Sequence, residues 1–210
     1  MYVIIIYSEE EDSMEQYSAK LTGEPFLYNE TKIIAQYLLD GESAEVLKKR
    51  NIEENLIQQK RVASVKRTNS AIFRRLAVMN NDMLYEFVNS DIVISKYILV
   101  YAIMKTDNLV KDFIKQIYYD KILLMKDYIE RIEIDNWFER IYADSNLNTI
   151  SDTTKYKLKQ VTMKIMMDSG LVNKEDERYR IIIPILNDKF KKLLNDADDI
   201  EYYKILGGIV

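Results

Sequence analysis

One stretch near the middle of the chain is apolar on every side of the helix that it would form. It begins with Ile92, Val93 and Ile94 and is almost uninterrupted over residues 97–104. A helix that is apolar all round belongs in the middle of a core, because none of its faces suits water. The run is well short of the ~18 to 20 residues that a membrane-spanning helix needs. The sequence therefore predicts that other segments pack around this one.

Turn-forming residues are scarce in the chain. Only five Gly and two Pro occur among 210 residues, which favours long helices over many short strands. The chain is long enough for a full core and short for two large domains. We therefore predict an all-α, mainly helical fold.

The composition removes several kinds of chemistry. There is no Cys and no His, which excludes thiolate metal sites, thiolate nucleophiles and every catalytic arrangement that uses imidazole. Glu130, Glu133 and Asp135 could hold Mg²⁺, but nothing else resembles a two-metal nuclease, and a solvated helix end is the simpler interpretation. We predict a protein that is not an enzyme and has no metal, cofactor or small-molecule substrate.

The N-terminus does not resemble a secretory signal. Residues 1–7 are apolar, but Glu9, Glu10, Glu11 and Asp12 follow directly and no Lys or Arg precedes them. A secretory signal has the opposite order of charges. We interpret the acidic run as a solvated surface or tail, although it could also cover a basic helix of the same chain. Since no membrane span is found either, we expect a cytoplasmic protein with no membrane partner.

The net charge of −4 hides an uneven distribution. Residues 1–43 carry two Lys and nine Asp or Glu, a net charge of −7, whereas residues 44–80 carry nine Lys or Arg and three Glu, a net charge of +6. The remaining 130 residues have a net charge of −3. An acidic protein with one concentrated basic segment can present one positive face to a phosphate backbone.

The basic segment lies in a helix-turn-helix-like pattern. Residues 31–39 have apolar side chains at helical spacing, and the tetrapeptide at residues 40–43, Asp-Gly-Glu-Ser, holds a helix stop and a helix start. We predict a short second helix over residues 44–50, a polar connection over residues 51–55 and a third helix over residues 60–79. Three helices with a Gly-containing turn and a basic third helix are typical of a helix-turn-helix.

The third helix has two opposite faces on a helical wheel. The apolar stripe, which must be buried, consists of Val62, Val65, Ile72, Phe73 and Leu76. The opposite face is basic, and its small residues Ser64 and Ala71 would let the helix approach a groove closely. We predict that nucleic acid binds here through Lys60, Arg61, Ser64, Arg67, Thr68, Arg74 and Arg75.

The C-terminal part predicts two helices and a hairpin. Asp135 would cap a helix over residues 136–144, and Ser151 would cap a second helix that ends before Gly170. A polar turn over residues 173–177 then separates two strand-like segments. A hairpin directly after a helix is typical of a winged helix. We predict that this helix and its wing contact a nucleic-acid backbone through Lys155, Lys159, Lys174, Arg178 and Arg180.

These patterns divide the chain into three parts. The first is an N-terminal extension over residues 1–16, and the second is a helical domain with the helix-turn-helix-like segment over residues 17–128. The third is a C-terminal winged-helix-like domain with one short β-hairpin over residues 129–210. The domain boundary is placed where the apolar helical region gives way to the capped helices and the hairpin.

Four short segments, in this order, resemble one known family. They are YSAKLTG at residues 17–23, NET at residues 29–31, ENLIQQKR at residues 54–61 and KTDNLVKDF at residues 105–113. On their order and spacing, the chain resembles BrxA, the small accessory protein of bacteriophage exclusion (BREX) systems, over about residues 17–205. Members of that family are often labelled inner-membrane proteins, which the absence of a span in this sequence contradicts.

The resemblance implies a helical fold similar to that of the antitermination factor NusB. It also implies DNA binding and a part in phage defence, beside a methyltransferase and an ATPase-containing complex. It supplies no catalytic residues, so the candidate contacts remain those that the charge pattern indicates.

Three hypotheses follow for function. The first is a non-enzymatic accessory protein that binds double-stranded DNA, mainly at its phosphates and with weak dependence on sequence. The second is an adaptor whose basic face docks an acidic surface of another BREX subunit. The third is RNA binding, because the same basic face does not distinguish the two backbones.

Overall fold

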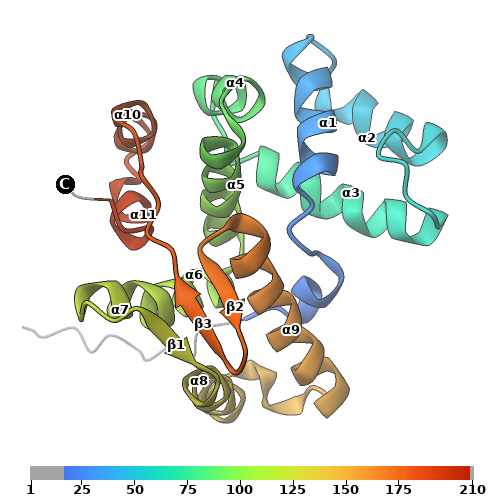
Figure 1. The fold of residues 1–210 in the computed structure, drawn as a ribbon. Helices are drawn as coiled ribbons and strands as arrows, with labels where there is room; N and C mark the ends of the chain where they lie inside the picture. The colour runs from blue at the N-terminus through green and yellow to red at the C-terminus, as the bar shows by residue number, and fades with distance from the viewer. Residues whose placement is uncertain (1–16, 209–210) are drawn as a thin grey trace, which may run out of the picture.

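The computed structural model describes residues 17–208. The predicted extension at residues 1–16, with its apolar and acidic runs, lies outside the described residues. Within the described range the fold is mainly helical, as predicted, and one small antiparallel sheet accompanies the helices (Figure 1).

Helices make up most of the described chain. In order they are the 3-10 helix η1 Ala19–Gly23, α1 Tyr28–Leu39, α2 Ala44–Glu54, α3 Val62–Leu76, α4 Asn81–Asn89, α5 Ile92–Thr106, α6 Asn108–Phe113, the π-helix η2 Ile114–Tyr119, α7 Asp120–Leu123, α8 Arg131–Asp144, the 3-10 helix η3 Asn146–Thr149, α9 Asp152–Ser169, α10 Asp188–Asp196 and α11 Ile200–Ile205. The strands are β1 Tyr128–Glu130, β2 Val172–Glu175 and β3 Arg178–Ile181.

Helix α5 forms the centre of the core, as predicted. All side chains of residues 97–104 are buried. The first turn differs from the prediction, because Ile92 and Val93 are exposed. In Figure 1, α10 and α11 lie on one side of α5, and α1 to α3 lie on the other. The apolar character of α5 is thus explained by neighbours on several sides.

Helices α1, α2 and α3 follow one another in the predicted order. Gly41 has a φ of +96°, which suits the tight turn after α1, and the Ser43 side chain accepts a hydrogen bond from the Val46 N–H at the start of α2. Helix α2 was predicted to end at residue 50, but it continues to Glu54. The reason is that Asn51 is buried, and its amide donates to Asn69 Oδ1 of α3 at 2.9 Å.

The predicted hairpin is present, but its turn consists only of residues 176 and 177, because residues 173–175, which were predicted as turn, belong to β2. A third strand, β1, was not predicted, and it pairs with β3 to give the sheet order β1-β3-β2. Helix α9 begins after its Ser151 cap and ends at Ser169, just before Gly170, as predicted. Chain order in this part is therefore β1, α8, α9, β2, β3.

The start of helix α8 differs from the prediction. The helix begins at Arg131, so Asp135 lies inside it and does not cap it. Glu130 is the cap, and it forms a reciprocal capping box with Glu133. Two of the three carboxylates considered for Mg²⁺ are thus used to cap a helix. No group of three or more acidic side chains suited to a metal ion is present within residues 17–208.

The first described residues connect the N-terminal and C-terminal parts. The Tyr17 backbone N–H donates to Asn146 Oδ1 at 2.8 Å, and the Asn146 amide donates back to the Tyr17 carbonyl oxygen at 2.8 Å. Helix η1 then packs against α9. This contact fixes α9 relative to the start of the chain, and η1 also lies against α3, as shown below.

Candidate nucleic-acid interface

The exposed side of helix α3 is a basic stripe with small residues at regular intervals. Lys66 and Arg67 are exposed near its middle, and Lys60 and Arg61 are exposed just before its first turn. Among the described residues, none of these four cations forms an ion pair. The small exposed residues Ala63, Ser70 and Ala77 follow one another at a spacing of seven residues. Such a helix can lie close to a phosphate backbone, because no large side chain holds it off.

The predicted apolar stripe of α3 is confirmed where its side chains are described. Val65, Ile72, Phe73 and Leu76 are all buried. The predicted basic face is partly wrong, because Thr68 and Ala71 are buried and Ser64 is half-buried. Helix α3 packs against α1, α2 and α5 at once, so its buried arc is wider than the apolar stripe alone indicates. The exposed arc is displaced by roughly a quarter turn on the wheel.

Arg75 was predicted to contact nucleic acid, and its burial corrects that assignment. The side chain is 1% exposed. Its guanidinium donates to the carbonyl oxygens of Glu24 and Pro25 at 2.9 Å and of Phe26 at 3.1 Å. Burial lowers the pKa of Arg75 to about 10. Arg75 therefore fastens the segment between η1 and α1 onto α3 and is inaccessible to a phosphate.

Arg74 and Asp107 extend this buried group of charges. Arg74 forms an ion pair with Glu24, which is itself buried. Asp107 is buried as well, accepts a hydrogen bond from the Val110 N–H at 3.1 Å, and interacts electrostatically with Arg74 and Arg75. Burial raises the pKa of Asp107 to about 6. Arg74 is half-exposed, but Glu24 neutralises its charge, so Arg74 is not a free cation at the surface.

A groove between α2 and α3 adds cations that sequence reasoning missed. It encloses about 480 Å³, and its charged lining residues are Lys48, Lys66 and Arg74, with no carboxylate among them. Lys48 Nζ lies 5.3 Å from the centre of the Phe73 ring. Lys66 falls beside the apolar stripe on the wheel, so only the packing of α3 reveals its exposure. The run of three basic residues at 48–50 was a signal for Lys48.

Gly23 lets Arg67 lie against η1. A Cβ atom on Gly23 would come within 2.5 Å of Arg67 Cδ and 2.7 Å of its Nε. Because η1 also packs on α9, this 3-10 helix lies between the two predicted basic regions. Lys20 of η1 is exposed and forms no ion pair with a described residue. The two regions are thus neighbours through η1.

Most of the basic residues predicted on α9 and the hairpin are held by a carboxylate or lie against an aromatic ring. Lys159 pairs with Asp135 at 2.7 Å, and Arg180 pairs with Glu175 at 3.6 Å. The other three candidates have no carboxylate partner among the described residues. Of these, Arg178 Cζ lies 3.8 Å from the Tyr128 ring centre, Lys155 Nζ lies 5.4 Å from the Tyr142 ring centre, and Lys174 is exposed.

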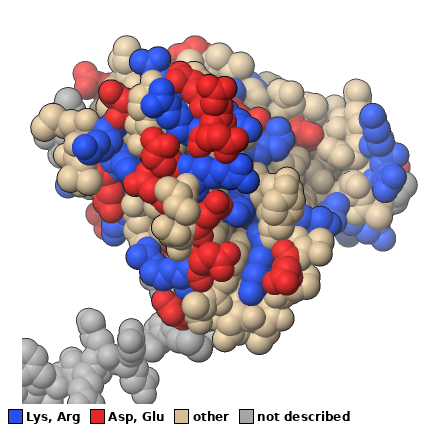
Figure 2. Space-filling model, turned by 60° about the horizontal axis from the view of Figure 1, so that its bottom comes forward, with Lys and Arg blue, Asp and Glu red and all other residues tan. Residues whose placement is uncertain are grey.

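The charges are arranged differently over the surface. In the view of Figure 2, Lys and Arg gather at the right-hand end, which is formed by α2 and α3, with few acidic residues between them. Over the middle of that face, basic and acidic residues alternate. The positive potential of this face is therefore concentrated at the α2–α3 end.

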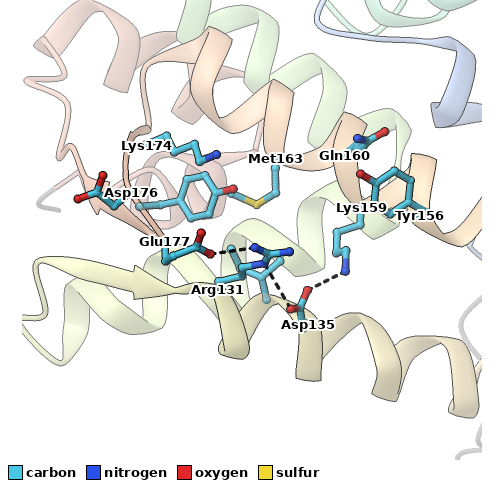
Figure 3. Close-up of a pocket in the computed structure, with 11 residues that line it drawn as sticks. Arg131, Asp135, Tyr156, Lys159, Gln160, Met163, Lys174, Asp176 and Glu177 are labelled. Atoms are coloured by element: carbon cyan, nitrogen blue, oxygen red, sulfur yellow. Dashed lines mark hydrogen bonds and ion pairs between the residues drawn. The ribbon is translucent and has the colours of Figure 1, made fainter.

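A cavity of about 250 Å³ lies between α8, α9 and the hairpin. Figure 3 shows the ion pairs at its edge: Arg131 with Glu177 at 2.8 Å, Lys159 with Asp135 at 2.7 Å, and Arg131 with Asp135 at 3.9 Å. The Arg131 guanidinium lowers the pKa of Glu177, and Glu177 raises that of Arg131. The cavity walls include Met163, which gives it an apolar part.

No helix within residues 17–208 is long and apolar enough to cross a membrane.

Two curated proteins of the same name are similar to this chain over most of its length. A curated protein of Bacillus cereus named "BREX protein BrxA" is 28% identical over 193 residues, which cover 91% of this chain and 96% of the relative. A second protein of that name, from Paramagnetospirillum magneticum, is 22% identical over 167 residues, which cover 79% of this chain and 83% of the relative.

The fold is also found in a crystal structure of an uncharacterized protein from Magnetospirillum magneticum. The two structures have a TM-score of 0.76 and 21% sequence identity, and the match covers 91% of this chain and 98% of the other. At that identity, the likeness concerns the fold alone. The family model named BrxA matches residues 15–198. Because this match extends over well more than half of the chain, the protein belongs to the BrxA family of the BREX phage-defence system.

Proposed function

We propose that this protein is a non-enzymatic accessory protein of phage defence that binds double-stranded DNA mainly through phosphates. The observation that carries the proposal is the basic stripe of α3, whose four cations Lys60, Arg61, Lys66 and Arg67 have no carboxylate partner in the described chain. A free cation binds a phosphate without first giving up an ion pair, so the electrostatic gain of binding is not offset. Family membership supports the accessory role.

The α2–α3 groove supports the same proposal. Lys48 of α2 and Lys66 of α3 line the groove from opposite helices, so the cations are spread over the groove and do not lie along one helix only. The small side chains of Ala63, Ser70 and Ala77 leave room for a ligand to come close to the helix between the cations. Contacts of this kind fix the position of the protein on the duplex and carry little sequence information, since they reach the backbone and not the base edges.

The helix α9 and its hairpin provide a second, weaker anchor. Lys155, Lys174 and Arg178 are the candidate cations of that region that form no ion pair with a described carboxylate. Exposed Lys20 lies on η1 between the two regions. A duplex that follows α3 toward η1 would therefore meet positive charge along its path.

A mobility-shift experiment tests the proposal. The purified protein is mixed with a random-sequence DNA duplex and with an RNA hairpin of equal length, each at about 50 and 200 mM salt. If about six phosphates are neutralised, DNA affinity falls by ~10³ between the two salt concentrations. A flat salt dependence, or no shift of the duplex at low salt, contradicts the proposal, and tighter binding to the hairpin favours the RNA alternative.

A charge-matched pair of variants locates the site. Lys66→Glu with Arg67→Glu reverses two charges on α3, and Lys115→Glu with Lys126→Glu reverses two exposed charges outside both basic regions. We expect the first variant to lose DNA binding and the second to keep most of it. Equal losses in the two variants would mean that net charge, and not this surface, controls binding.

The adaptor function remains a second candidate, because one observation favours it. Large apolar side chains are exposed at the end of α7 and just after β3. The hydrogen bond from the Ile181 N–H to the Asp127 carbonyl, at 2.8 Å, brings these two segments together. An exposed apolar group of this size suits a protein partner such as another BREX subunit. Its members are Leu123, Leu124, Met125, Ile183 and Ile185.

A further inference from the structure

The hairpin is closed onto helix α8 by one exposed ion pair. Arg131 lies in the first turn of α8, and Glu177 lies at the turn between β2 and β3, 46 residues further along the chain. Arg131 Nη1 donates to Glu177 Oε2 at 2.8 Å, and Figure 3 shows the two side chains pointing toward each other at the edge of the cavity. The side chain of Arg131 is 66% exposed and that of Glu177 is 81% exposed.

An ion pair this exposed is easily exchanged. Water solvates both partners when they separate, and salt screens their attraction, so such pairs contribute little to stability. The neighbouring pair of Lys159 with Asp135 differs, because these two side chains are only 30% and 33% exposed. Within the group of four charges, the Arg131–Glu177 pair is therefore the one that opens at the lower cost.

The surroundings of Arg131 suit an anion once Glu177 has moved away. Lys159 and Lys174 line the same cavity, so that three cations face the two remaining carboxylates, Asp135 and Asp176, and the lining keeps one net positive charge. The planar guanidinium of Arg binds a carboxylate and a phosphodiester with the same two-pronged geometry. A phosphodiester can thus take the place of the Glu177 carboxylate without a change in the position of α8.

We propose that this cavity is a binding site for a DNA phosphate, in which Arg131 is the ligand and Glu177 is a built-in competitor that occupies Arg131 in the free protein. The proposal rests on the DNA binding proposed above and names a contact that the charge pattern did not single out. It assigns to the hairpin turn a role that sets affinity: Glu177 keeps the second anchor weak, so that stable binding requires the α3 surface as well.

The test compares two neighbouring neutralisations. Glu177→Gln removes the competitor, whereas Asp176→Asn makes the same change of charge one residue away, at an exposed carboxylate that also lines the cavity but forms no ion pair with a described residue. Affinity for a random-sequence duplex is measured at several salt concentrations. We expect Glu177→Gln to tighten binding about 3- to 10-fold and to steepen the salt dependence by up to ~0.9 in log–log slope, and Asp176→Asn to do much less.

A double-mutant cycle ties the gain to Arg131. If Arg131 receives the phosphate, the affinity gained through Glu177→Gln disappears when Arg131→Gln is also present. Thermal melting of each variant checks that the hairpin still folds. Equal effects of Glu177→Gln and Asp176→Asn, or a gain that survives Arg131→Gln, would overturn the proposal while leaving α3 binding intact. Failure of the unmodified protein to bind any duplex would instead refute the proposed function, and this inference with it.

Discussion

Both basic regions of this protein contain cations that are paired with carboxylates, such as Arg74 with Glu24 on α3, but they differ in how many exposed candidate cations have no partner at all. On α3 and just before it, Lys60, Arg61, Lys66 and Arg67 have no carboxylate partner within residues 17–208. On α9 and the hairpin, Lys159 and Arg180 are held by carboxylates. A count of charges in the sequence treats the regions alike, but the charge available to a ligand differs. The difference shows that the positions of the acidic side chains decide how many cations a basic surface leaves without a partner.

Arg75 is the extreme case in this comparison, and it gives the largest expected effect. Arg75→Ala would leave three backbone carbonyls without their donor and a void beside α3, so we expect the free energy of unfolding to fall by about 3 to 5 kcal/mol. Arg67→Ala, at an exposed position of the same helix, should change it by only about 0.5 kcal/mol. Urea unfolding of both variants measures the difference, and equal values would show that the buried cluster contributes nothing special.

Reversing the free cations should have the next largest effect. We expect Lys66→Glu with Arg67→Glu to weaken duplex binding about 100-fold near 100 mM salt, because two phosphate contacts are lost and two repulsive charges are added. Fluorescence anisotropy with a labelled duplex measures this change, with urea unfolding as a control for the fold. A loss of less than about threefold would remove α3 from the interface.

One buried carboxylate makes the stability of the fold depend on pH. The pKa of Asp107 is raised to about 6 in the folded protein, above its value of ~3.8 in an unfolded chain, so the folded state binds more protons between these two values. The free energy of unfolding therefore falls as pH rises from about 4 to about 6, by about 2 kcal/mol from this group.

Asp107→Asn isolates this contribution, because Asn can still accept the hydrogen bond from the Val110 N–H. The stability of the unmodified protein relative to the variant should decline between pH 4 and pH 7 in urea unfolding, while duplex affinity at pH 7 stays the same in both. A stability difference that does not vary with pH would contradict the assignment.

The smallest expected effect belongs to the second region. Lys155→Glu with Lys174→Glu reverses the same number of charges as the α3 variant, but we expect only about a fivefold loss of affinity. Lys155 is already engaged with the Tyr142 ring, and the carboxylates Asp176 and Glu177 line the same cavity as Lys174. A loss as large as that of the α3 variant would show that the hairpin is an equal partner in binding and would remove the contrast between the regions.

Much of the fold can be predicted from the sequence where a local signal has one strong cause. The apolar run of α5 predicted the centre of the core, and Ser151 with Gly170 predicted both ends of α9. The start of α8 was missed because Asp135 is the more familiar cap, whereas the real cap, Glu130, works only together with Glu133. Strand β1 was missed because it has three residues and is recognised only by its pairing with β3.

The candidate site was harder to predict than the fold. A helical wheel gives the direction of the strongest apolar stripe, but the width of the buried arc depends on how many neighbours the helix has. For α3, contacts with α1, α2 and α5 bury Thr68 and Arg75, and they leave Lys66 exposed. Ion pairs between segments far apart in sequence, such as Arg131 with Glu177, leave no pattern that one sequence can show.

The salt dependence of duplex affinity tests the central claim most directly. The logarithm of affinity is measured against the logarithm of salt concentration for the unmodified protein, the Lys66→Glu, Arg67→Glu variant and the Lys155→Glu, Lys174→Glu variant. Each lost phosphate contact lowers the slope by ~0.9. If α3 is the main interface, its variant loses about two units of slope and the other loses less than one. Equal slopes for the two variants, or no binding by the unmodified protein, would contradict the account.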